Sequence, residues 1–119
     1  MQGGAMVTII NTEEFRRSGK TPEFEGYRHG DVPVSFFLVN ALPGGGPRLH
    51  RHPYAEVFVV QEGRAIFTVG DETHEVTGGH IVVAPPGTPH RFVNTGDGAL
   101  RTVNIHPTGQ MVTEWLEER

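Results

Sequence analysis

The 119-residue sequence contains no cysteine, which excludes disulfide bonds, thiol catalysis and metal sites with sulfur ligands. It has no excess of basic residues either, because 10 Lys and Arg stand against 14 Asp and Glu. This balance predicts neither nucleic acid nor an anionic membrane as a partner. No apolar run is long enough to span a bilayer, and no secretion signal is visible at the N-terminus. We therefore expect a soluble, cytoplasmic protein whose metal ligands, if it has any, are nitrogen and oxygen atoms.

The length of the chain predicts a single domain, residues 1–119, because 119 residues suffice for one hydrophobic core but not for two. The first five residues, MQGGA, are small and featureless, and they precede a second methionine at Met6. We expect residues 1–5 to be a disordered or vector-derived N-terminus, and the fold prediction leaves them out.

Turn-forming residues divide the chain into short segments that predict an all-β fold. The 16 glycines and 9 prolines gather at the joints between these segments. Runs rich in β-branched and aromatic residues predict seven strands, at residues 34–40, 56–61, 64–69, 73–77, 80–84, 91–94 and 100–106. Strands at this spacing indicate an antiparallel sandwich or barrel. A short helical turn is predicted at residues 11–16, where Asn11 precedes Glu14 in a capping pattern, and the tail 111–116 fits either a helix or a short strand.

Two histidines one residue apart, His50 and His52, are followed by a glutamate, Glu56. Alternate side chains of an extended strand share a face, so these three residues would point the same way. Imidazole and carboxylate groups on one face outline a metal site, and His90, after a turn rich in Gly and Pro, could supply another ligand. Because a lone pair of histidines is more often a surface feature, the case for a site depends on all four residues.

These residues belong to two blocks that match the two motifs of the cupin family. The first block is GGGPRLHRHPYAEVFVVQEG, residues 44–63, and the second is GHIVVAPPGTPHRFVN, residues 79–94. All five fixed positions of each motif are present at the family's spacing: Gly44, His50, His52, Glu56 and Gly63, then Gly79, Pro85, Gly87, His90 and Asn94. The sequence therefore resembles that of a small single-domain cupin. We expect the motif glycines to serve turns that require positive φ.

The resemblance implies a double-stranded β-helix, or jelly-roll barrel, with one metal ion inside. His50, His52, Glu56 and His90 fall on the family's four metal-ligand positions. Three imidazoles and one carboxylate suit a divalent transition metal ion, and iron, manganese, nickel, copper, cobalt and zinc all remain open. Four protein ligands would leave two positions free on a six-coordinate ion, with a formal charge of about +1 on the metal and its ligands.

An open and positively charged metal predicts a small anionic or enolisable compound as the partner. We expect a mononuclear-metal-dependent oxidoreductase of the dioxygenase type. Cupins also include isomerases, lyases and cyclases, and a non-catalytic cupin that only binds a small ligand fits as well, because a fold does not fix a function. Exposed sheet edges and faces further predict a homodimer.

The strand at residues 100–106 adds a candidate near the metal. His106 has the parity of Thr102 and Asn104, so these polar side chains should share one face. If that face lines the mouth of the barrel, His106 could act as an acid or base beyond the metal ligands.

Three residues are candidates for the substrate pocket. Phe58 and Phe92 continue the inward parity of Glu56 and His90, so they should line the pocket or pack in the ordinary core. Arg48 could hold a carboxylate at the pocket rim, although a surface position is equally consistent with the sequence.

The only tryptophan, Trp115, stands in the tail. We expect it to pack within the fold or contact a second subunit.

Overall fold

The computed structural model describes residues 6–117, so the prediction made for residues 1–5 lies outside the described part of the chain. The described elements are α1 (Glu13–Arg17), β1 (Glu23–Glu25), the 3₁₀ helix η1 (Gly26–His29), β2 (Ser35–Ala41), β3 (His50–Arg51), β4 (Glu56–Glu62), β5 (Arg64–Val69), β6 (Glu72–Thr77), β7 (Ile81–Ala84), β8 (His90–Asn94), β9 (Leu100–His106) and β10 (Glu114–Trp115). Among the residues described, no helix is long and apolar enough to cross a bilayer.

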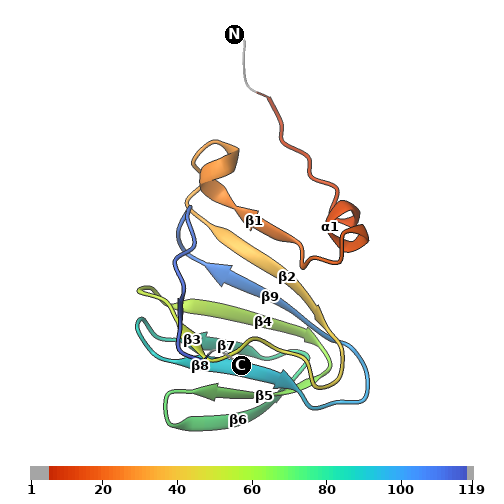
Figure 1. The fold of residues 1–119 in the computed structure, drawn as a ribbon, viewed down its shortest axis with the longest axis vertical. Helices are drawn as coiled ribbons and strands as arrows, with labels where there is room; N and C mark the ends of the chain where they lie inside the picture. Colours follow the sequence, from red (N-terminus) through yellow and green to blue (C-terminus); the bar gives the residue numbers. More distant parts are fainter. Residues whose placement is uncertain (1–5, 118–119) are drawn as a thin grey trace.

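The strands form two five-stranded sheets that pack face to face (Figure 1). The first sheet has the order β1-β2-β9-β4-β7, and the second has the order β10-β3-β8-β5-β6. Neighbouring strands are antiparallel throughout both sheets. The chain crosses repeatedly from one sheet to the other, as in a double-stranded β-helix of the jelly-roll type, and the predicted fold class is confirmed.

Each of the seven predicted strands is present, with ends within one residue of the prediction. The prediction missed β1 and β3, which are only two or three residues long, and left β10 open as one of two alternatives. Such short strands carry no alternating pattern of their own, because their place in a sheet depends on a distant partner. β10, for example, pairs with β3, so the tail adopts the strand rather than the helix that the sequence left open. The predicted helical turn is α1, where Asn11 Oδ1 accepts a hydrogen bond of 3.0 Å from the Glu13 amide.

The interior of the sandwich changes from apolar to polar along the strands. β4 and β9 alternate between buried and more exposed residues, as strands with one inward face do. The apolar end of the interior, which we call the core end, consists of Phe58, Val60, Ala65, Phe67, Val76, Ala84, Phe92 and Leu100. The opposite end, which we call the polar end, is buried as well, but it contains polar side chains: His50, His52, His90, His106, Glu56 and Asn104. The metal-ligand candidates therefore lie inside the fold and not on its surface.

The glycines at the fixed positions of the two motifs lie at turns. Gly44, Gly63, Gly79 and Gly87 all have positive φ, between 74° and 102°, as the motif pattern predicted. At Gly63 a Cβ atom would also lie 2.5 Å from the carbonyl oxygen of Ala99, so a larger residue would clash. The amide of Gly87 donates a hydrogen bond of 2.7 Å to the carbonyl of a residue of the first motif, His52, which fastens the two motifs together.

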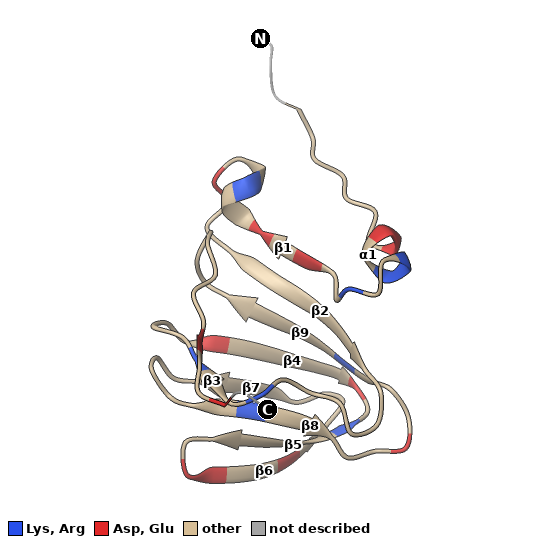
Figure 2. Ribbon diagram, in the orientation of Figure 1, with Lys and Arg blue, Asp and Glu red and all other residues tan. Residues whose placement is uncertain are grey.

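Charged residues of both signs are interspersed along the described chain (Figure 2). In α1, for example, Glu13 and Arg16 form an ion pair of 2.7 Å between two largely exposed side chains. Exposed pairs of this kind add little to stability, because water and salt screen them. The charges that matter to the site are those buried between the sheets.

Candidate metal centre

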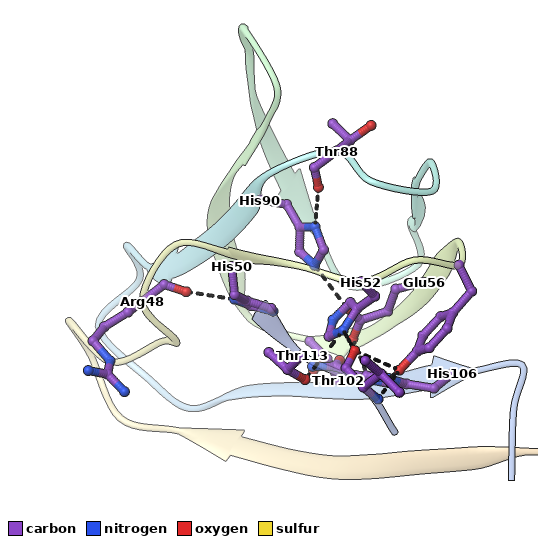
Figure 3. A network of polar contacts seen from close by, with 12 residues as sticks. Arg48, His50, His52, Glu56, Thr88, His90, Thr102, His106 and Thr113 are labelled. Carbon is purple, nitrogen blue, oxygen red and sulfur yellow. Dashed lines mark hydrogen bonds and ion pairs between the residues drawn. The ribbon is translucent and has the colours of Figure 1, made fainter. Parts of the chain in front are cut away.

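Four buried side chains converge between the two sheets. One ligand atom from each of His50, His52, Glu56 and His90 lies within 4.8 Å of the others (Figure 3). His50 and His90 are direct cross-strand partners on β3 and β8 of the second sheet. Glu56 begins β4 of the first sheet. We call these four side chains the His₃Glu group.

The route of the chain through this group differs from the prediction. We predicted that His50, His52 and Glu56 share the face of one extended strand, and this is wrong, because β3 and β4 belong to different sheets. Residues 52–55 connect β3 of the second sheet to β4 of the first sheet. The group therefore bridges the sandwich, and its assembly depends on the packing of one sheet against the other.

The orientation of each imidazole ring is fixed by a hydrogen bond to a backbone carbonyl. The Nδ1 atoms of His50, His52 and His90 lie 2.6, 2.8 and 2.9 Å from the carbonyl oxygens of Arg48, Val112 and Thr88. A carbonyl can only accept, so each Nδ1 must carry a proton and donate it. The neutral rings then present the lone pair of Nε2 to the common centre, which is how protein histidines are prepared for a metal ion.

Without a cation the centre has too many acceptors. Nε2 of His52 and Nε2 of His90 both lie 2.9 Å from Oε1 of Glu56. The His90 contact has hydrogen-bond geometry, whereas His52 Nε2 is buried and has no hydrogen-bond partner despite its short distance to the carboxylate. With each Nδ1 already protonated, only an extra proton or a metal ion can join these lone pairs to the carboxylate. The donor set thus fits a divalent metal ion.

The environment also shifts the pKa values of the group. Burial lowers the pKa of His50 to about 4, so this ring is neutral at neutral pH. Burial alone would raise the pKa of Glu56, but the close contacts of its carboxylate with His106, His52 and His90 outweigh burial and hold that pKa well below its usual range. Burial would lower the pKa of His52, but its contact with the Glu56 carboxylate and its hydrogen bond to the Val112 carbonyl outweigh burial and raise that pKa.

His106 contacts the group from the first sheet in the opposite tautomer. Its Nε2 lies 3.1 Å from Oε2 of Glu56, and its Nδ1 lies 2.7 Å from the hydroxyl of Tyr54. That hydroxyl accepts a hydrogen bond of 3.1 Å from the amide of Val112, and of the two acceptors near its own proton, His106 Nδ1 is closer than the Val112 carbonyl at 3.4 Å, so it donates to His106. The Nε2–H of a neutral His106 then donates to Glu56. His106 therefore acts on the carboxylate as a hydrogen-bond donor, while the three other histidines present lone pairs.

Tyr54 is the residue that the sequence prediction missed. Its ring stacks on His52 at 5.2 Å between centroids and 5° between planes, and burial raises the pKa of its hydroxyl. One signal was available, because Tyr54 lies two residues after His52 and two before Glu56 and so has their parity. The sequence could not show that the hydroxyl reaches His106, 52 positions away.

A cavity of about 460 Å³ opens beside the His₃Glu group and reaches His52 and His106. Its walls are largely apolar and aromatic, formed by Phe37, Val39, Ala41, Pro47, Phe92 and Trp115. Trp115 also contacts the ring of His50, with 4.9 Å between the ring centroids. The tail strand therefore helps to build the site.

The three residues predicted for the pocket lie in different surroundings. Phe92 both lines this cavity and packs in the core. Phe58 belongs to the core and meets the ring of His90 edge-on at 5.6 Å. Arg48 is exposed, and its guanidinium stacks over the ring of Trp115 at 4.9 Å. Figure 3 shows the Arg48 side chain directed away from the histidines, so a role for it in the pocket stays a prediction.

A jelly-roll sandwich with three histidines and one glutamate converging between its sheets is the architecture of a metal-binding cupin. Comparison of sequences agrees, because residues 37–106 match the family model described as Cupin domain. This match covers more than half of the chain, and the chain belongs to the cupin family.

Known proteins extend this comparison. The uncharacterized protein MJ1618 of Methanocaldococcus jannaschii is 34% identical over 77 residues, which are 62% of this chain and 62% of that protein. A double-stranded β-helix protein of Klebsiella pneumoniae superposes with a TM-score of 0.66 at 23% identity, over 74% of this chain and 79% of that one. Oxalate decarboxylase of Bacillus subtilis, a protein with Mn(II) centres, superposes with a TM-score of 0.67 at 26% identity, over 71% of this chain but 24% of that one.

Proposed function

We propose that the protein is a mononuclear-metal-dependent enzyme of the dioxygenase type that acts on a small anionic or enolisable compound. The observation that carries the proposal is the convergence of three pinned imidazoles and a buried carboxylate within 4.8 Å. The same nitrogen and oxygen donors suit iron, manganese, nickel, copper, cobalt and zinc. The Mn(II) centres of the structurally similar oxalate decarboxylase support a divalent ion of this kind.

Different residues of the chain would have different roles in such a site. His50, His52, Glu56 and His90 would hold the ion, which would supply Lewis acidity and, for iron or manganese, redox chemistry at its open positions. His106 holds Glu56 by its second carboxylate oxygen. The apolar cavity beside the group would bind the body of the substrate and exclude water from the reacting atoms.

The first experiment measures which metal the protein contains and whether it consumes oxygen. Elemental analysis of protein purified without added metal gives the native ion. Oxygen uptake by the iron- and manganese-loaded protein is then measured with diketones, flavonols and catechols. We expect uptake with at least one of these classes, and none with the His90→Ala variant. Absence of turnover with any metal and any of these compounds would contradict the enzyme proposal.

A lyase is the second candidate, because structures of oxalate decarboxylase resemble this chain at 26% identity. The two candidates differ in their consumption of oxygen. A lyase would split its substrate without net oxygen uptake, so carbon dioxide release is measured alongside the oxygen electrode. Recovery of unchanged ligand by mass spectrometry, despite tight binding, would instead support a non-catalytic binding cupin.

We also propose that the protein is a homodimer. β7 is an edge strand of the first sheet, and its Ile81 and Val83 side chains are 67% and 54% exposed. Met6, Val7 and Ile9, which precede α1, are exposed by more than 80%. Exposed apolar groups at a sheet edge favour association with a second copy. Light scattering should give twice the mass of one chain, and a monomer at micromolar concentration would contradict this proposal.

A further inference from the structure

One polar side chain in the cavity has no role in the His₃Glu group. Asn104 lies in the middle of β9, paired in register with Phe37 of β2 and Phe58 of β4. It is 6% exposed, and its side chain lines the cavity of about 460 Å³. Asn104 is two residues from His106 on the same face of the strand, which places it about 7 Å farther along the cavity.

The amide of Asn104 is held in one orientation by a neighbour. The hydroxyl of Thr102 donates a hydrogen bond of 2.7 Å to Asn104 Oδ1, and both side chains are buried. Within residues 6–117 the Thr102 hydroxyl donates to no other acceptor. If Oδ1 and Nδ2 of Asn104 exchanged places, the buried hydroxyl proton of Thr102 would therefore lose its acceptor. Oδ1 is thereby occupied. No described residue accepts a hydrogen bond from Nδ2, which remains available to the cavity.

The walls of the cavity restrict which ligand can meet this amide. Among the described residues that line it, none is a lysine, arginine, aspartate or glutamate. A dianion would therefore depend on the metal alone for compensation of its charge. Phe37, Phe92 and Trp115 instead offer aromatic surface of the size that a ring or a short apolar chain occupies.

We propose that Asn104 determines the specificity of this site by donating a hydrogen bond from Nδ2 to an oxygen of a monoanionic, ring-bearing ligand. The inference rests on the proposed function, because the anionic end of the ligand would lie at the metal, near His52 and His106. The ring would lie between Phe37 and Trp115. The ligand class is thus an enolate or similar monoanion with an apolar body, and small dianions such as oxalate bind less well.

Calorimetry on the zinc-loaded full chain tests this assignment, because zinc does not support redox turnover. The probes are benzoylacetone, whose enolate has a ring and acceptor oxygens, 4-phenylimidazole, a ring-bearing metal ligand without an oxygen, and oxalate. The variant is the double substitution Thr102→Val with Asn104→Leu, which removes both hydrogen-bonding partners while keeping the packing volume. Thr73→Val is the control, because Thr73 is exposed on β6 and does not line the cavity.

We expect the double variant to weaken benzoylacetone binding by about tenfold, the usual effect of losing one hydrogen bond to a charged acceptor. Binding of 4-phenylimidazole should not change, and Thr73→Val should change the binding of neither probe. In the wild-type protein, benzoylacetone should shift the NMR signals of the Asn104 side-chain amide, and this measurement does not depend on how well the variant folds. Oxalate should bind more weakly than benzoylacetone.

Equal weakening of both ring-bearing probes, or of neither, would overturn the assignment to Asn104 while the enzyme proposal stands. An unshifted amide signal or tighter binding of oxalate would overturn it as well. Conversely, a protein that binds zinc and shows the expected probe selectivity but turns over no substrate would contradict the enzyme proposal alone. A wild-type protein that takes up no metal would overturn both.

Discussion

The two ends of the sandwich interior are built by the same strands and have opposite chemistry. β4 starts with Glu56 at the polar end and continues with Phe58 and Val60 into the core end. β9 runs antiparallel to it, from Leu100 at the core end to His106 at the polar end. Both ends are buried to a similar degree. Because their side chains differ in polarity, burial changes the free energy of folding in opposite directions at the two ends.

At the core end burial stabilises the fold, because apolar surface leaves water. At the polar end burial removes water from a carboxylate and several imidazoles, which costs free energy unless a cation compensates. The fold therefore gains stability at the core end, whereas burial of the polar end costs free energy. Substitutions at the two ends should therefore separate stability from metal binding.

The largest effect is expected at the core end. Phe67 is 1% exposed and stacks on Phe92 at 4.9 Å, so Phe67→Ala leaves a large cavity. The free energy of unfolding should fall by about 3–5 kcal/mol, measured by urea unfolding. Val93→Ala on the outer face of the neighbouring strand, where the side chain is 37% exposed, is the control and should change it far less. A Phe67 variant of unchanged stability would contradict the role of the core end.

Removal of a metal ligand should have the next largest effect. Substitution of residues that merely support metal ligands costs 10- to 100-fold in affinity, so His90→Ala should lower metal affinity by more than about 100-fold. Metal content after dialysis, measured by elemental analysis, checks this. His74→Ala is the control, because this histidine is exposed on β6. If the His90 variant retained its metal, His90 would not be a ligand.

A smaller effect is expected from the hydrogen bond that orients His106. Tyr54→Phe keeps the ring that stacks on His52 but removes the hydroxyl 2.7 Å from His106 Nδ1. Glu56 would then be held less firmly, and metal affinity should fall by about tenfold, measured by competition with a chelator. Tyr27→Phe at a position that is 40% exposed serves as the control. Equal affinity of both variants would show that the hydroxyl does not support the centre.

The last comparison concerns pH, because two histidines of the polar end have pKa values shifted in opposite directions. His50 has a lowered pKa of about 4, so its contribution to stability is present above about pH 6.5 and is lost as pH falls toward 4. His52 has a raised pKa, so its contribution is present below about pH 6.5 and is lost as pH rises through the folded-state value. The free energy of unfolding of metal-free protein should therefore be highest near pH 6.5 and fall on either side of it, measured by urea unfolding across the pH range.

NMR titration of the two rings in metal-free protein checks these directions. His52 should take up its proton at a higher pH than His50. Protons also compete with the metal for the imidazoles, so metal content should fall as the pH drops below about 6.5. Protonation of His50 before His52 would contradict the environments described above.

The sequence predicted those features that depend on local pattern. The seven longer strands followed from alternation and turn residues, and the spacing of the two motifs indicated His50, His52, Glu56 and His90. What it could not predict depends on pairing between distant segments. The position of β10 beside β3 and the contact of Tyr54 with His106 join residues more than 50 positions apart. The extent of the single domain, residues 1–119, and the homodimer stay predictions.

The backbone carbonyl and amide of Val112, in the tail, determine when the metal centre can form during synthesis of the chain. Val112 accepts the hydrogen bond from His52 Nδ1 and orients the hydroxyl of Tyr54 through its amide. During synthesis on the ribosome, Val112 emerges after both motifs have left the exit tunnel. The metal centre therefore becomes complete only when the last strand docks. Chains that stop short of Val112 would contain every ligand residue and still lack the backbone group that fixes His52.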